Sequence, residues 1–382
     1  MEYFFLFGRL KALSLVELET VCKNYLKSEF KLTDKGEYIS LETDTAKNYV
    51  DKVFFKLGGF VKYGYILNQD LDVLKLSENK KVVFGLSSYT SKVSFKDLKD
   101  LSQKFKDYFL SVNRKVRFVL PKKGKELSTS QVKSNGLIQK GFELVFFNGK
   151  LGKTLGVQDI EGFSLRDYEK PFVNKKIGVL PMKLSRMMIN LANLQKGEAL
   201  WDPFCGSGNI LLEGLDLGHD VIGSDIDAKS LDGAKENLNW AKKKFGYRQN
   251  SHIFYFDVLN PSISKLGILN NLNIGAIICE PYMGEAQRKA LKTEKASFLV
   301  TQHLNLVRGL FQSIELLKLE KKIKLVIVFP EYKTEKGWLS VDKNLLENKN
   351  FKVLKISDKD LHWSRVNSII KRLILVFEYI PK

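Results

Sequence analysis

The sequence predicts two architectures in succession: an α+β first half, then a doubly wound α/β domain with a mostly parallel, seven-stranded sheet. After about residue 175, five short apolar runs recur, and helical patterns separate most of them. Such alternation is typical of a parallel sheet. Two further strand patterns come late, with little helix between them. Before residue 175 the chain mixes short strand patterns with a few helices, which favours an α+β region.

The first half is expected to begin with a strand and then a helix. Ser14 precedes an apolar helical run and Glu17 lies three residues further on, which is the pattern of a capping box. Ser128 or Ser130 is expected to cap a later helix. Asn-Gly at 148–149 separates two strand patterns and is the strongest short hairpin signal. The predicted strands are 3–7, 37–41, 62–67, 82–85, 114–120, 142–147 and 153–160, with a helix over 95–111.

The second half supplies the strands of the parallel sheet. The late pair is expected to run antiparallel at one edge of that sheet. Since parallel strands end at the same edge, side chains that follow them are expected to line one crevice. The five apolar runs are 198–203, 219–225, 251–256, 274–279 and 324–329, and the late pair is 351–356 with 368–380.

Composition indicates a globular, strongly basic protein. The chain has 382 residues, 44% of them hydrophobic and 27% charged, and a formal net charge of +19. The positive charge is spread over both halves, which suits a polyanionic partner such as nucleic acid or an anionic membrane. A genome rich in A and T also raises the lysine content of its proteins, so charge alone does not decide the partner.

Cysteine and histidine usage argues against structural metal or disulfide sites. The three cysteines, Cys22, Cys205 and Cys279, are far apart, and only four histidines are present. We therefore expect no metal site and a reducing, cytoplasmic location. No apolar run approaches the roughly 20 residues of a membrane span, and the N-terminus has acids where a signal peptide would have its cleavage site.

The strongest local motif is WDPFCGSGNILLEG, residues 201–214. A strand ends in Asp202, and Gly206 and Gly208 then lead into a helix, so the backbone can approach a ligand closely. The glycine spacing is neither that of a dinucleotide fingerprint nor that of a phosphate-binding loop. An acid in this place would repel a pyrophosphate but suits the ammonium and sulfonium of S-adenosylmethionine.

Two more acids follow successive strands. Asp225 follows the second strand, where it can accept hydrogen bonds from ribose hydroxyls, and Asp257 follows the third, where it can accept from the adenine amino group. Each acid alone is a common feature of strand ends. Three acids at the carboxyl ends of three successive strands indicate an S-adenosylmethionine site. The neighbouring Phe204, Cys205, Ile226 and Val258 are assigned to the same site.

With DPFCGSG, SDID, FDV and EPYMG in series, the second half resembles class I S-adenosylmethionine-dependent N-methyltransferases. More narrowly it resembles THUMP-domain tRNA guanine-N2 methyltransferases of the archaeal guanosine-10 type. The segment 152–194 is similar to the family's link between its RNA-binding module and its catalytic core. The loop LPMKL in this link lies against the cofactor in the family, which assigns Leu180 and Pro181 to the site.

The resemblance implies a domain arrangement: a ferredoxin-like region at 1–60, a THUMP RNA-binding domain at 61–165, a linker and cofactor-side loop at 166–185 and a Rossmann-like methyltransferase domain at 186–382. It also implies that the first two parts grasp the acceptor stem and 3′ end of tRNA. We expect a monomer with no membrane partner, and sequence leaves open whether a small activating protein is required.

The loop EPYMG, which follows the fourth strand, is the predicted catalytic loop. The family motif is Asp-Pro-Pro-Tyr/Phe, often followed by glycine. Gapless matching places Glu280 at the acid and Pro281 at the first proline, with Tyr282 in place of the second proline. A shifted match keeps Pro281-Tyr282 together but puts Cys279 at the acid, which is chemically poor. We prefer the first match. Tyr282, Phe204 and Trp363 are the candidates for stacking on the substrate base.

Basic side chains on the first half are the candidate RNA contacts: Lys122, Lys123, Lys125, Lys133 and Lys140. Such contacts go mostly to phosphates, although a lysine run is also an ordinary solvated loop. Three other functions stay open from sequence: a ribosomal RNA guanine-N2 methyltransferase, a DNA adenine or cytosine N-methyltransferase, and an RNA-binding module that keeps S-adenosylmethionine only as a structural ligand.

Overall fold

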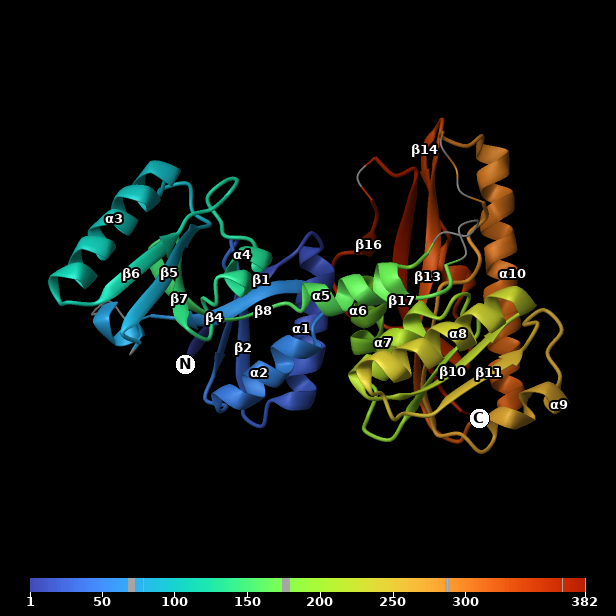
Figure 1. The fold of residues 1–382 in the computed structure, drawn as a ribbon. Coiled ribbons are helices and arrows are strands. Elements are labelled where there is room, and N and C mark those ends of the chain that lie inside the picture. The colour runs from blue at the N-terminus through green and yellow to red at the C-terminus, as the bar shows by residue number, and fades with distance from the viewer. Residues whose placement is uncertain are drawn as a thin grey trace. The chain divides into compact units, whose positions relative to one another are not determined.

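The computed structural model describes residues 1–67, 73–77, 79–173, 179–285, 287, 289–365 and 367–381. The chain divides into two compact units (Figure 1). The first unit consists of Met1–Leu15 and Cys22–Ile160, and the second of Val16–Val21 and Glu161–Lys382. Among the described residues, no helix is both long and apolar enough to cross a membrane.

The first unit is built on one eight-stranded sheet with the order β2-β3-β1-β4-β8-β7-β5-β6. Most neighbours are antiparallel, but β5 runs parallel to both β6 and β7. The strands are β1 (Glu2–Phe7), β2 (Phe30–Asp34), β3 (Ile39–Thr43), β4 (Phe60–Ile66), β5 (Lys81–Ser88), β6 (Lys115–Val119), β7 (Gly141–Phe147) and β8 (Lys150–Val157). The helices are α1 (Lys11–Tyr25), α2 (Lys47–Lys56), α3 (Phe95–Ser111) and α4 (Thr129–Ser134).

Several local predictions for this unit are confirmed. The α3 helix has the predicted bounds, and Ser128 caps α4 through a capping box with Gln131. The β7–β8 hairpin turns at Asn148-Gly149, where Gly149 has a positive φ of 76°. The short strand β2 was not predicted, and neither was the helix α2, although its buried Val50, Val53 and Phe54 have helical spacing.

The predicted capping box at Ser14 is wrong. Helix α1 begins at Lys11, three residues earlier, with Leu10 as an N-cap that offers no side-chain acceptor. The Ser14 hydroxyl lies inside the helix and donates to the Gly59 carbonyl at 3.2 Å. Tertiary contact with the β4 region therefore overrides the local signal.

Strand β4 joins the two parts of the first unit that sequence treats as separate domains. It pairs with β1 on one side and with β8 on the other. The boundary proposed at residue 60 thus falls at the start of a strand that both parts share, and the compact unit continues to Ile160.

The second unit contains the predicted doubly wound sheet, in the order β11-β10-β9-β12-β13-β17-β15. The five strands from β11 to β13 are parallel, and β17 runs antiparallel to β13 and β15. The late antiparallel edge is therefore confirmed. The strands are β9 (Ala199–Asp202), β10 (Asp220–Asp225), β11 (Ser251–Tyr255), β12 (Ile274–Cys279), β13 (Ile323–Thr334), β15 (Phe351–Val353) and β17 (Ile370–Tyr379).

Two short strands extend this sheet beyond the prediction. Strand β14 (Gly337–Leu339) forms a hairpin with the end of β13, and β16 (Leu361–Trp363) pairs with β17. The segment 323–334 is longer than the apolar run that predicted it, because the polar residues after Pro330 continue as a strand only through pairing with β14 and β17.

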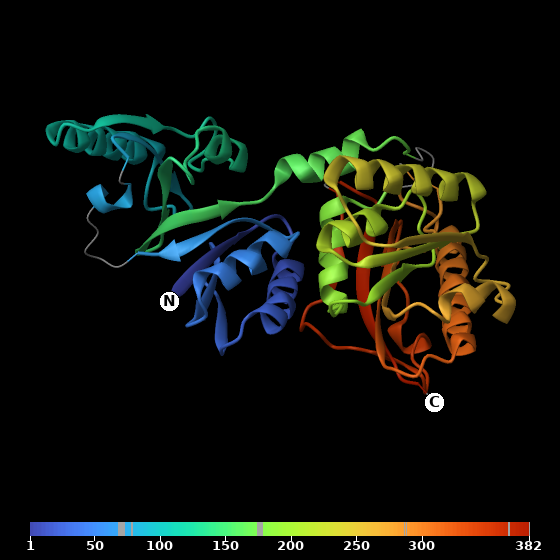
Figure 2. The same ribbon diagram turned by 60° about the horizontal axis from the view of Figure 1, so that its bottom comes forward.

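Helices cover both faces of this sheet (Figure 2). Helix α7 (Asn209–Leu217) packs so closely on one face that a side chain at Gly214 would collide with Leu200 and Val221. Helix α10 (Thr293–Leu317) buries its apolar stripe on the other face, in the core that contains Trp201 and Phe329. The remaining helices are α5 (Ile160–Ser164), α6 (Met182–Ala192), α8 (Ala228–Phe245) and α9 (Ile263–Leu266).

Candidate active site

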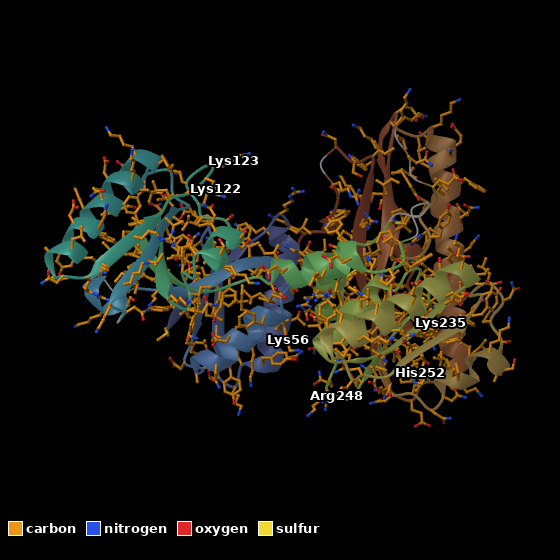
Figure 3. All side chains as sticks on the ribbon, in the orientation of Figure 1. Lys56, Lys122, Lys123, Lys235, Arg248 and His252 are labelled. Atoms are coloured by element: carbon orange, nitrogen blue, oxygen red, sulfur yellow. The ribbon has the colours of Figure 1, made fainter. Side chains whose placement is uncertain are left out.

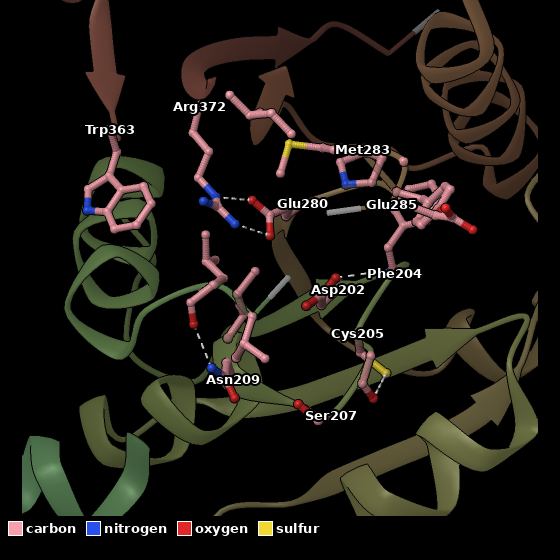
Figure 4. A pocket seen from close by; sticks show the side chains of 18 of the residues that line it. Asp202, Phe204, Cys205, Ser207, Asn209, Glu280, Met283, Glu285, Trp363 and Arg372 are labelled. Atoms are coloured by element: carbon pink, nitrogen blue, oxygen red, sulfur yellow. Dashed lines mark hydrogen bonds and ion pairs between the residues drawn. The ribbon is translucent and has the colours of Figure 1, made fainter. Parts of the chain in front are cut away.

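A pocket opens in the second unit at the carboxyl ends of β9 and β12 (Figure 4). The strands β16 and β17 contribute a further wall. The lining residues lie within 179–180, 202–210, 280–287 and 363–372, together with Ser230. Of the predicted site residues, the pocket wall contains Leu180, Asp202, Phe204, Cys205, Gly206, Glu280, Pro281 and Tyr282, and it does not contain Pro181, Gly208, Asp225, Ile226, Asp257 or Val258.

The turn after β9 forms the floor of the pocket. Asp202 ends the strand, and one of its carboxylate oxygens accepts a hydrogen bond from the Phe204 amide at 3.1 Å. Gly206 and Gly208 have φ values of 49° and 85°, in the region that favours glycine. Gly208 caps α7 and packs near Ala234, so it shapes the turn without lining the pocket.

Asp202 is a buried acid, with 2% of its surface exposed. Burial, together with the negative charges of Asp225 and Glu280, raises the pKa of its carboxyl well above the ordinary value. Among the described residues Asp202 forms no ion pair. A cation bound in the pocket would stabilise a buried carboxylate of this kind, so Asp202 fits the cationic methionine part of S-adenosylmethionine.

Asp225 supports the turn from below. Its carboxylate accepts hydrogen bonds from the Gly206 and Asp227 amides, both at 2.9 Å. Burial raises the pKa of this carboxyl, and the two amides act in the opposite direction. Asp225 therefore connects the end of β10 to the glycine turn of β9, a role that sequence reasoning did not assign to it.

The remaining predicted cofactor residues lie outside the pocket. Ile226 is 58% exposed, and Val258 is buried in the core beneath Gly309. Asp257 accepts hydrogen bonds from the Leu259 amide at 2.9 Å and from the Asn260 side chain at 2.6 Å. Ile226 and Asp257 thus follow the neighbouring strands β10 and β11.

Sequence reasoning missed the residues that hold the loop containing Leu180. The Asn209 side chain donates to the Leu180 carbonyl at 2.6 Å and accepts from the Lys170 ammonium at 2.5 Å. Lys170 is almost fully buried, and burial lowers its pKa to about 8. Asn209 could have been singled out as a polar residue at the first position of α7, directly after the second glycine. Its partners Leu180 and Lys170 lie far away in sequence, so no local pattern identifies them.

The linker before this loop is anchored by a buried ion-pair cluster. Arg166 donates to Glu213 at 2.6 Å and to Asp216 at 3.2 Å, and Arg186 donates to Glu213 at 2.7 Å and also pairs with Asp216. Two cations and two anions balance, and each arginine bridges both carboxylates. The Tyr247 hydroxyl completes the cluster by donating to Asp216 at 2.5 Å.

Glu280 is held by Arg372 on the opposite side of the pocket from the Asn209 loop. The Arg372 guanidinium donates through Nε to one carboxylate oxygen and through Nη2 to the other at 3.2 Å. Trp363 lies opposite Arg372 in the β16–β17 register, and its ring is 4.8 Å from the guanidinium carbon. The row Trp363–Arg372–Glu280 is visible in Figure 4.

This row explains what the longer acid does. Glutamate carries one methylene more than aspartate, and its carboxylate meets a guanidinium that projects from β17, which is separated from β12 by β13. A carboxylate has about four lone-pair sites, so a bidentate arginine leaves acceptor capacity for another donor. Glu280 is therefore oriented by Arg372 and can still accept a hydrogen bond from a substrate amine.

Tertiary contacts hold the EPYMG loop where the second proline of the family motif is absent. The Tyr332 hydroxyl donates to the Met283 carbonyl at 2.6 Å. His303 Nδ1 lies 3.3 Å from the Tyr282 carbonyl, which can only accept, so Nδ1 carries the proton. Burial lowers the pKa of His303 to about 4, which keeps the ring neutral. Gly284 completes the loop with a φ of 82°.

The geometry favours the first of the two motif matches. Cys279 is completely buried in the core beneath α10, and burial raises the pKa of its thiol well above the ordinary value. Glu280, the next residue, faces the pocket. Tyr282 also lines the pocket and is 48% exposed, as a stacking side chain at a pocket mouth would be.

The five lysines proposed as RNA contacts have different environments. Lys122 and Lys123 are exposed on one loop of the first unit (Figure 3). Lys140 is also exposed. Lys133 lies 3.7 Å from Asp159. Lys125 donates to the carbonyls of Thr90 and Val93 at 2.5 and 3.0 Å, so its ammonium anchors the loop.

Comparison with known proteins shows a partial match to one family. Residues 172–295 match the family described as RMKL-like, methyltransferase domain. The chain is 33% identical over 163 residues to the tRNA (guanine(10)-N2)-dimethyltransferase of Methanothermobacter thermautotrophicus, covering 42% of this chain and 44% of that protein. It is 36% identical over 104 residues to the tRNA (guanine(10)-N(2))-methyltransferase of Saccharomyces cerevisiae, covering 27% of this chain and 23% of that protein. Each alignment thus spans less than half of the relative.

Solved structures agree at the level of the fold. TrmN from Thermus thermophilus aligns over the whole of both chains with a TM-score of 0.53 and 13% sequence identity. A possible methylase from Clostridium difficile 630 aligns over all of this chain and 99% of its own, with a TM-score of 0.52 and 15% identity.

The second unit therefore has the Rossmann-like fold of class I methyltransferases. Residues 172–295 match the RMKL-like methyltransferase domain family, and the curated relatives support the resemblance to tRNA guanine-N2 methyltransferases that the sequence motifs indicated.

Proposed function

We propose that this protein is an S-adenosylmethionine-dependent tRNA methyltransferase that methylates the exocyclic N2 of a guanosine at a position equivalent to 10. The observation that carries the proposal is that two acids with different surroundings line one pocket. Asp202 is buried and has no cationic partner among the described residues, and Glu280 lines the same pocket and is paired with Arg372. The curated relatives named above supply the substrate class.

The cofactor assignment rests on the chemistry of the β9 turn. When bound, S-adenosylmethionine supplies an activated methyl group on a positively charged sulfur. Asp202 would offset the cationic charge of the methionine part, and the turn at Gly206 leaves room for close backbone approach. Asp225, Ile226 and Asp257 would contact the ribose and adenine on the open side of the turn.

The substrate side of the pocket positions the target amine. Guanine N2 is a weak nucleophile because its lone pair is delocalised into the ring, so the nitrogen must be held in line at about 3–3.5 Å from the methyl carbon. Glu280 would accept one N–H bond and offset the positive charge that develops on the nitrogen. Tyr282 or Trp363 would stack on the base, which must leave its helix to reach the pocket.

The first unit is the proposed tRNA-binding part. We propose that its two parts correspond to the ferredoxin-like region and THUMP domain of the resembling family, and that Lys122, Lys123 and Lys140 contact phosphates. Lys125 would act indirectly by holding the loop that contains Lys122 and Lys123. Lys133, with a distant carboxylate neighbour, would contribute less.

Nucleoside analysis of tRNA tests the proposal. Mass spectrometry of tRNA from cells with and without the gene is expected to show loss of N2-methylguanosine or N2,N2-dimethylguanosine at one position. Purified protein with labelled S-adenosylmethionine should restore the modification on that tRNA. Transfer to plasmid DNA or to ribosomal RNA in preference to tRNA would replace the proposed substrate, and binding of the cofactor without transfer would leave only a structural role for it.

A further inference from the structure

The hairpin formed by β13 and β14 presents a basic surface that neither the pocket nor the first unit uses. Lys333 and Trp338 lie directly opposite each other in the hairpin register, so their side chains share one face. Lys336 lies at the turn between the strands, and all three side chains are exposed, Trp338 by 42%. We define Lys333, Lys336, Trp338 and Lys371 as the hairpin surface.

Lys371 joins this surface from the neighbouring strand. Its ammonium lies 3.9 Å from the centre of the Trp338 ring, a cation–π contact that fixes the indole on the sheet. Strand β17 continues from Lys371 to Arg372, and the Lys333 amide donates to the Ile369 carbonyl at 2.8 Å. Because Ile369 and Arg372 both line the pocket, the hairpin surface directly adjoins the pocket wall.

The carboxylates near this surface are already engaged. Glu331, which pairs with Lys371 in the β13–β17 register, lies with one carboxylate oxygen 3.0 Å from His362 Nε2 and is mostly buried. Glu335, at the hairpin turn, accepts from the amide and hydroxyl of Thr293 at 3.0 and 2.8 Å. In the part of the chain that the structure describes, Lys333 and Lys336 form no ion pair, so their charge is directed to solvent.

We propose that the hairpin surface is a second RNA-binding surface, which holds the substrate strand beside the target nucleotide. This inference rests on the proposed function, because a target base that leaves its helix also exposes the phosphates and bases next to it. Lysines at this position would contact those phosphates, and the open part of the Trp338 ring would stack on an unpaired base. Cations interleaved with an exposed aromatic side chain are the pattern of single-strand binding.

Filter binding of the substrate tRNA over a range of salt concentrations tests the proposal with the full-length protein. In Lys333→Gln/Lys336→Gln, we expect the Kd for tRNA to rise about tenfold, and the slope of log K against log salt to flatten by about 1.4–1.8 for two lost phosphate contacts. Trp338→Ala should weaken binding several-fold with little change in slope. The kcat at saturating tRNA and the affinity for S-adenosylmethionine should not change.

A matched control is available at the other end of β17. Lys349 and Lys352 are exposed near β15, which pairs with the end of β17 at Tyr379, whereas Lys371 lies at the start of β17. Lys349→Gln/Lys352→Gln removes the same charge and should bind tRNA as the wild type does. Equal Kd and slope for the two double variants would overturn the hairpin surface, whether or not the protein methylates tRNA.

The same measurements separate this proposal from the proposed function. If the wild type binds tRNA through the hairpin surface but transfers no methyl group, the RNA-binding proposal is supported and the proposed activity is rejected. If the wild type methylates tRNA and the hairpin variant keeps its affinity for tRNA, the proposed activity is supported and the RNA-binding proposal is rejected. A wild type that binds no RNA, or that binds plasmid DNA more tightly, overturns both.

Discussion

The two acidic residues of the pocket are held in opposite ways. Asp202 lies on a turn that is shaped by its glycines and by the hydrogen bond from the Gly206 amide to the Asp225 carboxylate. Among the described residues Asp202 has no cationic partner. Glu280 lies on a loop that departs from the family motif, and it is bound by an arginine from a distant strand. The charge of Asp202 can therefore be balanced by a cationic ligand, whereas the charge of Glu280 is already balanced by Arg372.

This difference indicates that a ligand must supply positive charge near Asp202 but not near Glu280. A buried carboxylate without a partner costs free energy, so the β9 turn is stabilised when a cationic ligand binds. The Glu280–Arg372 pair is neutral as a unit, so it needs no cation from outside, and the arginine orients a carboxylate whose local negative charge faces the substrate amine. The cofactor side should therefore respond mainly in affinity, and the substrate side mainly in turnover.

The largest expected effect comes from removing the charge of Asp202. Asp202→Asn should abolish detectable S-adenosylmethionine binding, with a loss of about a thousandfold, because a neutral amide cannot offset the ligand charge. The same change should raise the free energy of unfolding of the ligand-free protein by about 1 kcal/mol at pH 7.5, since a buried unpaired charge is removed. Calorimetric titration and urea unfolding measure the two quantities. Weaker binding together with lower stability would instead indicate a damaged fold.

Glu280→Gln should show the opposite pattern to Asp202→Asn. The amide oxygen keeps an acceptor for Arg372 and for the substrate amine, but it no longer offsets charge on the reacting nitrogen. We expect kcat to fall about a hundredfold, comparable with the loss of one transition-state contact, while the affinity for S-adenosylmethionine stays within about twofold. Single-turnover assays with saturating tRNA separate the two quantities, and unchanged turnover would exclude Glu280 as the acceptor.

The same contrast explains how much of the site was predictable from sequence. Asp202, Gly206 and Asp225 follow strands at regular spacing, and local backbone geometry is enough to bring them together. The partners of the EPYMG loop come from segments 21 to 92 residues away, and no local pattern marks Arg372, Tyr332 or His303 as contacts of that loop. Sequence therefore identified the acid of the loop but not what holds it.

The fold shows the same division. Strands with an apolar period were found in both units, and the late antiparallel pair was placed correctly. The polar end of β13 and the short strands β14 and β16 were missed, because their strand structure depends on pairing with neighbours. These missed strands carry Trp338 and Trp363, the two indoles beside the pocket wall.

A smaller effect is expected from His303, which supports the EPYMG loop. The pKa of His303 is lowered from 6.5 to about 4 in the folded protein. Its contribution to stability is therefore fully present above about pH 6.5 and is lost as the pH falls toward 4, because only the unfolded chain then takes up the proton. Between pH 7.5 and pH 5.0 this amounts to roughly 2 kcal/mol of the free energy of unfolding.

His303→Asn is the matched control for this effect. The asparagine amide can donate near the position of Nδ1 but does not titrate in this pH range. The difference in unfolding free energy between wild type and variant should therefore shrink by roughly 2 kcal/mol as the pH is lowered from 7.5 to 5.0 in urea titrations. A difference that does not depend on pH would show that His303 titrates normally in the folded state.

The smallest expected effect tests whether the longer acid and Arg372 form one unit. Glu280→Asp restores the acid of the family motif but shortens the side chain by one methylene, so the carboxylate no longer reaches the guanidinium at its present position. If the pair matters, this apparent return to the motif should lower kcat about tenfold, and Arg372→Met should cost little more in the aspartate background than the first change alone. Non-additive losses in this double-mutant cycle would demonstrate the coupling, since residues in direct contact deviate from additivity. Additive losses, or an aspartate variant as active as the wild type, would show that Glu280 acts without Arg372 and that the substrate side of the pocket depends on the acid alone.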